Sequence, residues 1–189
     1  MTRTVSNPLS RAVCAAATAI GLVLLGSGAA GAATDGQPAG KVSGLPVPRY
    51  VSLKTDRVNL REGPSKDHRT AWIFQRAGLP VEITAEYEVW RRIRDAAGTE
   101  GWGLHSLLFG RRTALVTPWA KNPAEALPLY DRADDKGNVV AQLQPNVIAS
   151  VKSCTGGWCR IVIAQPGRDM SGFMKQDRLW GVYPNEKVE

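Results

Sequence analysis

The strongest constraint on the fold is an internal repeat, because the second half of the chain follows the first at an offset of about 70 residues. Four short segments match in the same order. They pair residues 58–61 with 127–130, 90–93 with 158–161, 101–102 with 172–173, and 108–110 with 179–181. This period is too long for one unit of a solenoid and long enough for a small domain. The repeat therefore predicts two small domains, each around a core of its own.

The hydrophobic pattern within each copy is that of β-strands. Residues 81–87 alternate apolar and polar side chains with a period of two, as an antiparallel strand with one buried face does. Further strands are expected at residues 58–61, 90–95, 100–105 and 113–116 of the first copy, and at 139–143, 147–152, 158–163 and 172–174 of the second. One 3₁₀ turn is expected at residues 106–108. Several short strands in about 60 residues predict an all-β fold of small closed barrels, because closure removes exposed sheet edges.

The N-terminal segment has the pattern of a secretory signal peptide. Arg3 and Arg11 precede an uncharged apolar stretch, residues 12–25, which is shorter than the roughly 20 residues of a membrane-spanning helix. Small residues follow, so we expect cleavage after Ala32 or Ala33 and a periplasmic or secreted protein with no stable membrane span. An uncleaved membrane anchor is the alternative. Without residues 1–33 the formal charge falls from +7 to about +5.

Composition also predicts where the domains begin and end. Proline and glycine are frequent in residues 34–49, which favours a flexible leader after the signal peptide. The expected order is a signal peptide at 1–33, this leader, a first domain at 50–116, a linker at 117–126, a second domain at 127–184 and a tail at 185–189.

Cys154 and Cys159 are predicted to form a disulfide. Two β-prone runs flank residues 155–158, a composition that favours a hairpin, and facing residues of a hairpin are close enough for the bond. Thiols of an exported protein tend to pair. A redox-active dithiol is the alternative, but the spacing differs from the C-x-x-C pattern that lowers a thiol pKa.

The first copy resembles the bacterial SH3-like (SH3b) domain family. The resemblance rests on residues 58–65 (VNLREGPS), 78–81 (GLPV), 90–93 (WRRI) and 100–103 (EGWG). The second copy departs from this pattern at its start, where Tyr130 to Ala133 replace the Arg-x-Gly-Pro portion. The resemblance implies two SH3-like barrels in tandem and a binding function, with a cell-wall peptide or an envelope protein as partner.

Aromatic side chains are the best candidates for a ligand groove, because a flat apolar ring binds an extended peptide at little entropic cost. The candidates are Tyr50, Trp90 and Trp102 in the first copy, and Trp158 and Phe173 in the second. The alternative for Trp102 and Phe173 is a place in the core, since a small barrel needs large side chains to fill it.

Arg91, Arg92 and Arg94 are candidates for contact with an anionic partner. The alternative is a solvated face whose charge Glu82, Glu86 and Glu88 neutralise. Nucleic acid is not expected as a partner, because an exported protein rarely meets it and no RNA-binding motif is present. The sequence leaves the oligomeric state open.

No catalytic residue, cofactor or metal site is expected. His68 and His105 have no nearby nucleophile, and Asp134 and Asp135 are adjacent in a turn and point apart. No metal-ligand spacing occurs. The sequence predicts an exported, non-catalytic binding protein. A structural role for two barrels packed together, and a hydrolase or thiol-redox activity, are the alternatives.

Overall fold

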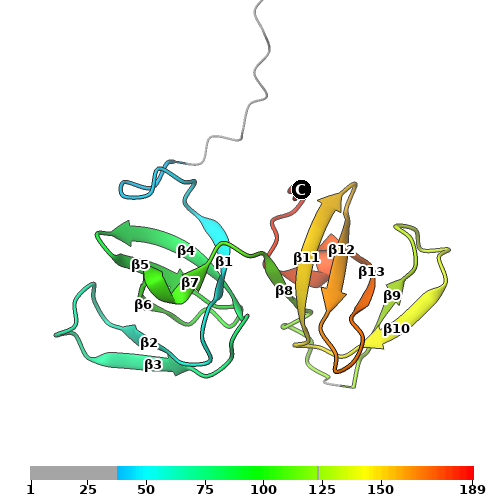
Figure 1. Cartoon of the computed structure of the whole chain (residues 1–189), viewed down its shortest axis with the longest axis horizontal. Helices are drawn as coiled ribbons and strands as arrows, with labels where there is room; N and C mark the ends of the chain where they lie inside the picture. The colour runs from blue at the N-terminus through cyan, green and yellow to red at the C-terminus, as the bar shows by residue number, and fades with distance from the viewer. Residues whose placement is uncertain (1–37, 123) are drawn as a thin grey trace, which may run out of the picture. The chain divides into compact units, whose positions relative to one another are not determined.

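The computed structural model describes residues 38–122 and 124–189, and over these residues the chain is all-β with no α-helix. The described residues belong to one compact unit of the chain, Asp35–Glu189. Their strands form two antiparallel sheets of seven strands each, β1 to β7 and β8 to β14 (Figure 1). The expected signal peptide, residues 1–33, lies outside the described residues.

The two sheets have the same strand order, with each strand replaced by its counterpart seven places later in the chain. The first sheet consists of β1 (Arg49–Leu53), β2 (Val58–Arg61), β3 (Thr70–Phe74), β4 (Pro80–Tyr87), β5 (Trp90–Arg94), β6 (Glu100–Leu104) and β7 (Leu108–Phe109), with the 3₁₀ turn η1 (His105–Leu107) before β7. The second consists of β8 (Thr113–Val116), β9 (Leu127–Tyr130), β10 (Val139–Leu143), β11 (Ile148–Thr155), β12 (Trp158–Ile163), β13 (Met170–Lys175) and β14 (Leu179–Trp180), with the turn η2 (Gln176–Arg178) before β14. The repeat predicted from the sequence is therefore a repeat of structure.

Each sheet curves around its own hydrophobic core. In the first, Val58 and Leu60 of β2 pack with Val81, Ile83 and Ile93, while Asn59 between them is exposed. The second core contains Leu129, Ile161 and Met174 of the counterpart strands, and no residue belongs to both clusters. The expected period-two alternation therefore fills two separate cores, as two small barrels require.

Strand β8 belongs to the second barrel, whereas the sequence analysis assigned residues 113–116 to the first domain. It pairs with β11 and β14, as β1 pairs with β4 and β7. The reason is burial: Ala114 and Val116 are fully enclosed in the second core. Residues 117–126 are consequently the β8–β9 loop of the second barrel and not a linker between domains. The counterpart loop in the first barrel spans only residues 54–57.

The described part of the expected flexible leader is folded against β4. The Gly40 N–H donates to the Leu45 carbonyl at 2.8 Å and closes a tight turn. The Glu86 carboxylate accepts the Ser43 hydroxyl at 2.6 Å and the Ser43 N–H at 2.9 Å, and its side chain is only 1% exposed. A polar turn of this composition is ordered because a buried carboxylate satisfies its backbone donors.

The β11–β12 hairpin carries the predicted disulfide. Cys154 and Cys159 face each other in register with their Cα atoms 4.1 Å apart, and their sulfurs are bonded. Gly156 and Gly157 both have positive φ, which the two-residue turn between these strands requires. At the counterpart position of the first barrel, Glu86 faces Arg91 and forms an ion pair at 3.3 Å. The β11–β12 hairpin is thus closed by a disulfide and the β4–β5 hairpin by an ion pair.

Candidate functional site

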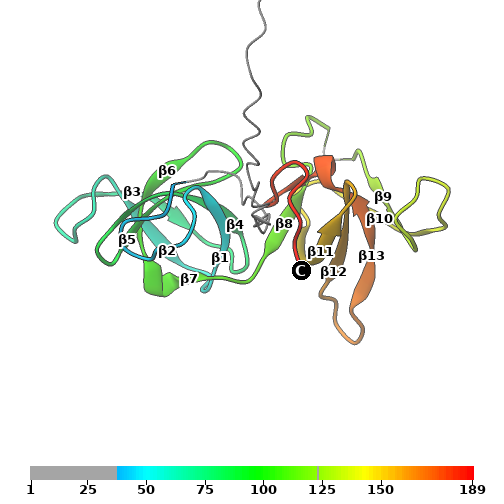
Figure 2. The same ribbon diagram turned by 90° about the horizontal axis from the view of Figure 1, so that it is seen from above.

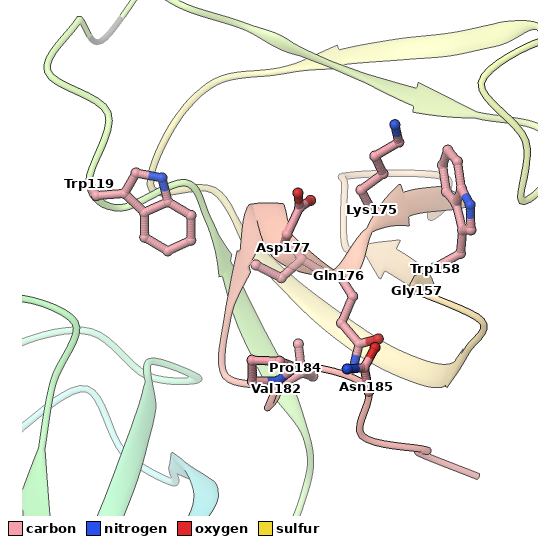
Figure 3. A pocket seen from close by; sticks show the side chains of 10 residues that line it. Trp119, Gly157, Trp158, Lys175, Gln176, Asp177, Val182, Pro184 and Asn185 are labelled. Carbon is pink, nitrogen blue, oxygen red and sulfur yellow. The ribbon is translucent and has the colours of Figure 1, made fainter. Parts of the chain in front are cut away.

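A pocket of about 500 Å³ opens in the second barrel (Figure 3). It lies where the β8–β9 loop, η2 and the C-terminal residues 182–185 meet the start of β12. Its lining consists of Trp119, Gly157, Trp158, Lys175, Gln176, Asp177, Leu179, Val182, Pro184 and Asn185. This volume is within the range of small-ligand sites, and two indole rings among a few polar groups are typical of such sites.

Trp158, a predicted ligand-binding residue, is held in the pocket from two sides. It opens β12 and faces Lys175 on β13, whose Nζ lies 5.7 Å from the centroid of its ring. Tyr130 packs on it edge to face, with the ring centroids 5.7 Å apart. Lys175 also pairs with Asp135 at 2.7 Å, and this hydrogen bond raises the pKa of Lys175. The lysine is therefore charged at neutral pH, and both Lys175 and Tyr130 contact the indole.

Phe173, a second predicted residue, lies on the same outer face as Trp158. It is two positions before Lys175 on β13 and therefore projects from the same side of the sheet. In register it faces Tyr130, and it is half-buried and outside the core cluster. Trp158, Phe173 and Tyr130 together form an aromatic strip. The sequence analysis missed Tyr130, although an aromatic residue where the first copy has Arg61 could have marked it.

Trp119 is the other residue that the sequence analysis missed. It lies in the β8–β9 loop, is 53% exposed and lines the pocket (Figure 3). The sequence predicts a linker at residues 117–126, and a linker side chain is not expected to line a binding site. Its signal was present in the sequence, as a tryptophan in a polar, proline-containing segment. The pocket depends on this loop, which is longer than its counterpart in the first barrel.

Tyr50 and Trp90 are buried, with exposed fractions of 7% and 6%. Tyr50 packs between Trp180 and Tyr183, at centroid distances of 5.2 and 4.6 Å, and burial raises its pKa. A buried ring offers no surface to a ligand, so neither residue belongs to the proposed site. The burial of Tyr50 could not be predicted, because the sequence pattern does not show that Trp180 and Tyr183 cover this part of β1.

Trp102 is half-buried on β6, at the position that Phe173 has on β13. It faces Arg61 on one side and Arg92 on the other. It is outside the core cluster of the first barrel, as Phe173 is in the second. Its neighbours are charged and not aromatic, so the first barrel has no counterpart of the aromatic strip at this position.

The three candidate arginines all have acidic partners. Arg91 pairs with Glu86, Arg92 with Glu100 and Arg94 with Glu82. Arg91 is buried, and its guanidinium also donates to the Glu88 carbonyl at 2.9 Å. Two of the neutralising acids, Glu82 and Glu86, are those expected from the sequence. Because each of these arginines has an acidic partner, the arrangement supports the solvated, neutralised face.

The remaining expectations concern metals, histidines and membranes. In the described ranges, 38–122 and 124–189, no group of three His, Cys, Asp or Glu side chains is placed to hold a metal ion. His68 and His105 are exposed. Within the same ranges no helix is long and apolar enough to cross a membrane.

Comparison with solved structures found NlpC2 and NlpC1 from Trichomonas vaginalis. The chain is 14% identical to NlpC2, with 70% of this chain and 48% of that one covered and a TM-score of 0.31. It is 15% identical to NlpC1, with 75% and 48% covered and a TM-score of 0.31. The chain thus spans about half the length of these two structures. At such TM-scores they support no conclusion about its fold or activity.

The family comparison agrees with the repeat. No curated protein matched the chain. The family model of the bacterial SH3 domain matches it twice, over residues 54–110 and 124–181, which is more than half of its length. Each match covers the β2-to-β7 part of one barrel or its counterpart in the other. With two such domains, of a class that generally serves as a binding module, the chain belongs to the bacterial SH3 domain family.

Proposed function

We propose that this is an exported, non-catalytic protein whose second barrel binds an extended peptide of the cell envelope, from either a cell-wall peptide or an envelope protein. Membership of the bacterial SH3 family supports a binding role. The signal-peptide pattern of residues 1–33 and the Cys154–Cys159 disulfide are compatible with a location outside the cytoplasm.

The observation that carries this proposal is the pocket with Trp119 and Trp158 in its wall, next to the aromatic strip. An extended peptide that enters the pocket would place alternate side chains against Trp158 and Phe173, which project from one face of the sheet. Aromatic anchors in a concave site supply most of the affinity of such contacts.

The second barrel is favoured over the first by three differences at matching positions. Trp90, the counterpart of Trp158, is buried. Its cross-strand neighbour is Leu104, where Trp158 has Lys175. The short loop at residues 54–57 has no tryptophan to match Trp119. The two copies share a fold, but only the second combines Trp158 at the pocket, Lys175 opposite it and a loop that contributes Trp119.

The test is retention of the full-length chain, expressed in an exporting bacterium, on purified cell-wall material. We expect Trp158→Ala and Trp119→Ala each to weaken retention by about tenfold or more, the loss typical of an aromatic hot spot. Trp72→Ala is the matched control, because Trp72 on β3 is also 53% exposed but lies in the first barrel. Equal losses for all three variants, or no loss at Trp158 and Trp119, would reject the site.

A structural role is the second candidate, and the packing of Tyr50 against Trp180 and Tyr183 favours it. A protein that serves only as a rigid spacer should show no retention on cell-wall material and no retained envelope protein. Its solution scattering should be that of one rigid particle. Retention that depends on Trp158 would exclude this role as the only one.

A thiol-redox activity requires free cysteines. The structure has Cys154 and Cys159 as a disulfide, and both sulfurs are in the buried core. Labelling of the exported protein with a thiol reagent after denaturation should therefore modify neither residue. Two labelled thiols would restore the redox alternative.

A further inference from the structure

The side-chain amide of Gln176 is held through its nitrogen and has no partner at its oxygen. Nε2 donates to the carbonyl of Tyr183 at 2.7 Å and to that of Glu186 at 3.0 Å. Because both partners are acceptors, they determine which end of the amide is nitrogen. Oε1 is buried and has no hydrogen-bond partner among the described residues, and Gln176 as a whole is 5% exposed.

Gln176 holds the C-terminal strap, which we define as residues 181–189. Arg112 binds the strap through both carboxylate oxygens of Glu186, each at 2.8 Å, and through the Gly181 carbonyl at 3.0 Å. Val188 pairs with the backbone of Cys154, with N–O distances of 2.9 and 3.2 Å. Through Val182, Pro184 and Asn185 the strap forms one wall of the pocket, and Figure 3 shows the Gln176 side chain extending towards Asn185.

The charged groups of the pocket wall already have partners. Lys175 is paired with Asp135 at 2.7 Å, and Asp177 lies 3.7 Å from Arg178. The buried side-chain nitrogen and oxygen atoms without a partner in the described part of the chain are Arg112 Nε, Thr117 Oγ1, Gln176 Oε1 and Trp180 Nε1. Of the residues that carry them, only Gln176 lines the pocket. Oε1 is therefore the buried side-chain atom of the described pocket lining that has no hydrogen-bond partner.

We propose that Gln176 is a ligand-binding residue of the pocket, whose Oε1 accepts a hydrogen bond from a backbone N–H of the bound peptide while Nε2 holds the strap as the pocket wall. The inference rests on the proposed function, because it names the contact that a peptide makes in the same pocket. An extended backbone supplies such a donor between the side chains that meet the aromatic strip. A buried acceptor that gains a donor on binding increases the affinity for a peptide over that for an apolar ligand of the same shape.

The direct test observes the carbonyl of Gln176 in the wild-type protein. Soluble fragments that retain the peptides are prepared from purified cell wall by cleaving its glycan chains and are titrated into ¹³C-labelled full-length protein. We expect the Gln176 ¹³Cδ resonance to move with saturation, as it does when an amide oxygen accepts a new hydrogen bond. The ¹³Cδ resonance of Gln142, an exposed glutamine on β10, should stay in place.

Variants separate the ligand contact from the strap. Gln176→Met removes the amide at nearly constant shape and should lower retention on cell wall by about tenfold, whereas Gln142→Met should leave it unchanged. Glu186→Ala loosens the strap but keeps the Gln176 oxygen, so it should lower retention less than Gln176→Met does.

The outcomes distinguish the two proposals. Absence of wild-type retention on cell-wall material, together with the absence of any envelope protein retained by the wild type, would overturn the proposed function and this inference with it. Retention of the wild type together with a stationary Gln176 resonance would overturn the inference alone. Equal losses for Gln176→Met and Glu186→Ala would also overturn it, because Gln176 would then act only through the strap.

Discussion

Glu86 accepts hydrogen bonds from a segment that composition alone describes as flexible. Its carboxylate is nearly inaccessible and binds Ser43, Arg49 and the Val42 N–H. Burial on its own raises the pKa of Glu86, but these hydrogen bonds outweigh it and lower the pKa from 4.5 to about 2. At the scale of single residues, one carboxylate thus links the turn before β1 to β4.

The sign of this shift predicts a pH dependence of stability. A folded-state pKa below the unfolded value stabilises the protein above about pH 4.5, and the contribution is lost as the pH falls towards 2. The free energy of unfolding of Glu86→Gln should therefore be lower than that of the wild type at pH 7. The pH-dependent part of the difference should be about 3 kcal/mol and should shrink towards zero near pH 2.

Urea unfolding of both proteins from pH 7 to pH 2 measures this difference. Glu88→Gln is the control, because Glu88 is exposed two residues further along the chain. A difference between wild type and Glu86→Gln that stays constant with pH would contradict the prediction.

In each barrel a glycine allows two strands to approach closely, β6 to β2 in the first and β13 to β9 in the second. A Cβ on Gly172 of β13 would lie 2.5 Å from Leu129 Cγ and 2.7 Å from the Tyr130 carbonyl oxygen. In the first barrel, a Cβ on Gly101 of β6 would lie 2.9 Å from Leu60 Cβ. At the scale of elements, each barrel has a glycine followed by an aromatic residue, Gly101–Trp102 or Gly172–Phe173. The glycine, which has no side chain, faces the inside of the barrel, and the aromatic ring faces outward.

We expect Gly172→Ala to lower the free energy of unfolding by about 1–3 kcal/mol, because the added methyl group overpacks the contact with β9. Gly110→Ala should change it by less than about 0.5 kcal/mol, since no atom lies within 4 Å of the new Cβ. Denaturant titration of both variants measures the difference. Equal effects would show that this close approach tolerates a side chain.

We expect the disulfide to stabilise one hairpin, β11–β12. Replacing Cys154 and Cys159 together by Ser should lower the free energy of unfolding by about 2 kcal/mol, because the bond closes a short loop. Amide exchange should accelerate at the β11–β12 hairpin and at Val188, which pairs with Cys154. Exchange in the β4–β5 hairpin, closed by the Glu86–Arg91 pair, should stay as it was. Acceleration in both hairpins would contradict this local role.

Across the whole molecule, the strap connects the second barrel to a residue of the first. The Tyr183 hydroxyl donates to Glu82 of β4 at 2.8 Å, and its ring packs on Tyr50 of β1. Burial and this acidic partner raise the pKa of Tyr183. Since Gln176 donates to the Tyr183 carbonyl, Tyr183 contacts both a residue of the pocket wall and the first sheet.

Tyr183→Phe removes the hydroxyl and leaves the ring. It should lower the free energy of unfolding by about 1.5–3 kcal/mol, the range for a hydrogen bond to a charged group. Tyr87→Phe, at an exposed tyrosine of the first sheet, should have almost no effect. Guanidinium unfolding monitored by tryptophan fluorescence compares the two. Indistinguishable variants would mean that the Tyr183–Glu82 bond adds nothing to stability.

Some features followed from the sequence because their causes are local. The strands at residues 139–143 and 158–163 have the bounds predicted from β-prone composition and the strand order of the first copy. The disulfide follows from two cysteines that flank a glycine turn. The repeat itself indicates two cores. Trp158 and Phe173 are ligand candidates from the sequence, and the structure places both on one face of the sheet.

The remaining features depend on which segments meet. The sequence indicates a strand at residues 113–116, but only the packing of Ala114 and Val116 assigns this fully buried strand to the second core. Distant segments also determine the surroundings of Tyr50 and Trp119. The ring of Tyr50 is covered by residues more than a hundred positions later, and the loop with Trp119 forms a pocket wall beside η2 and the strap. A side chain's own neighbours in sequence determine the direction in which it points, while its exposure depends on distant segments that cover it, and these are determined only when the chain has folded.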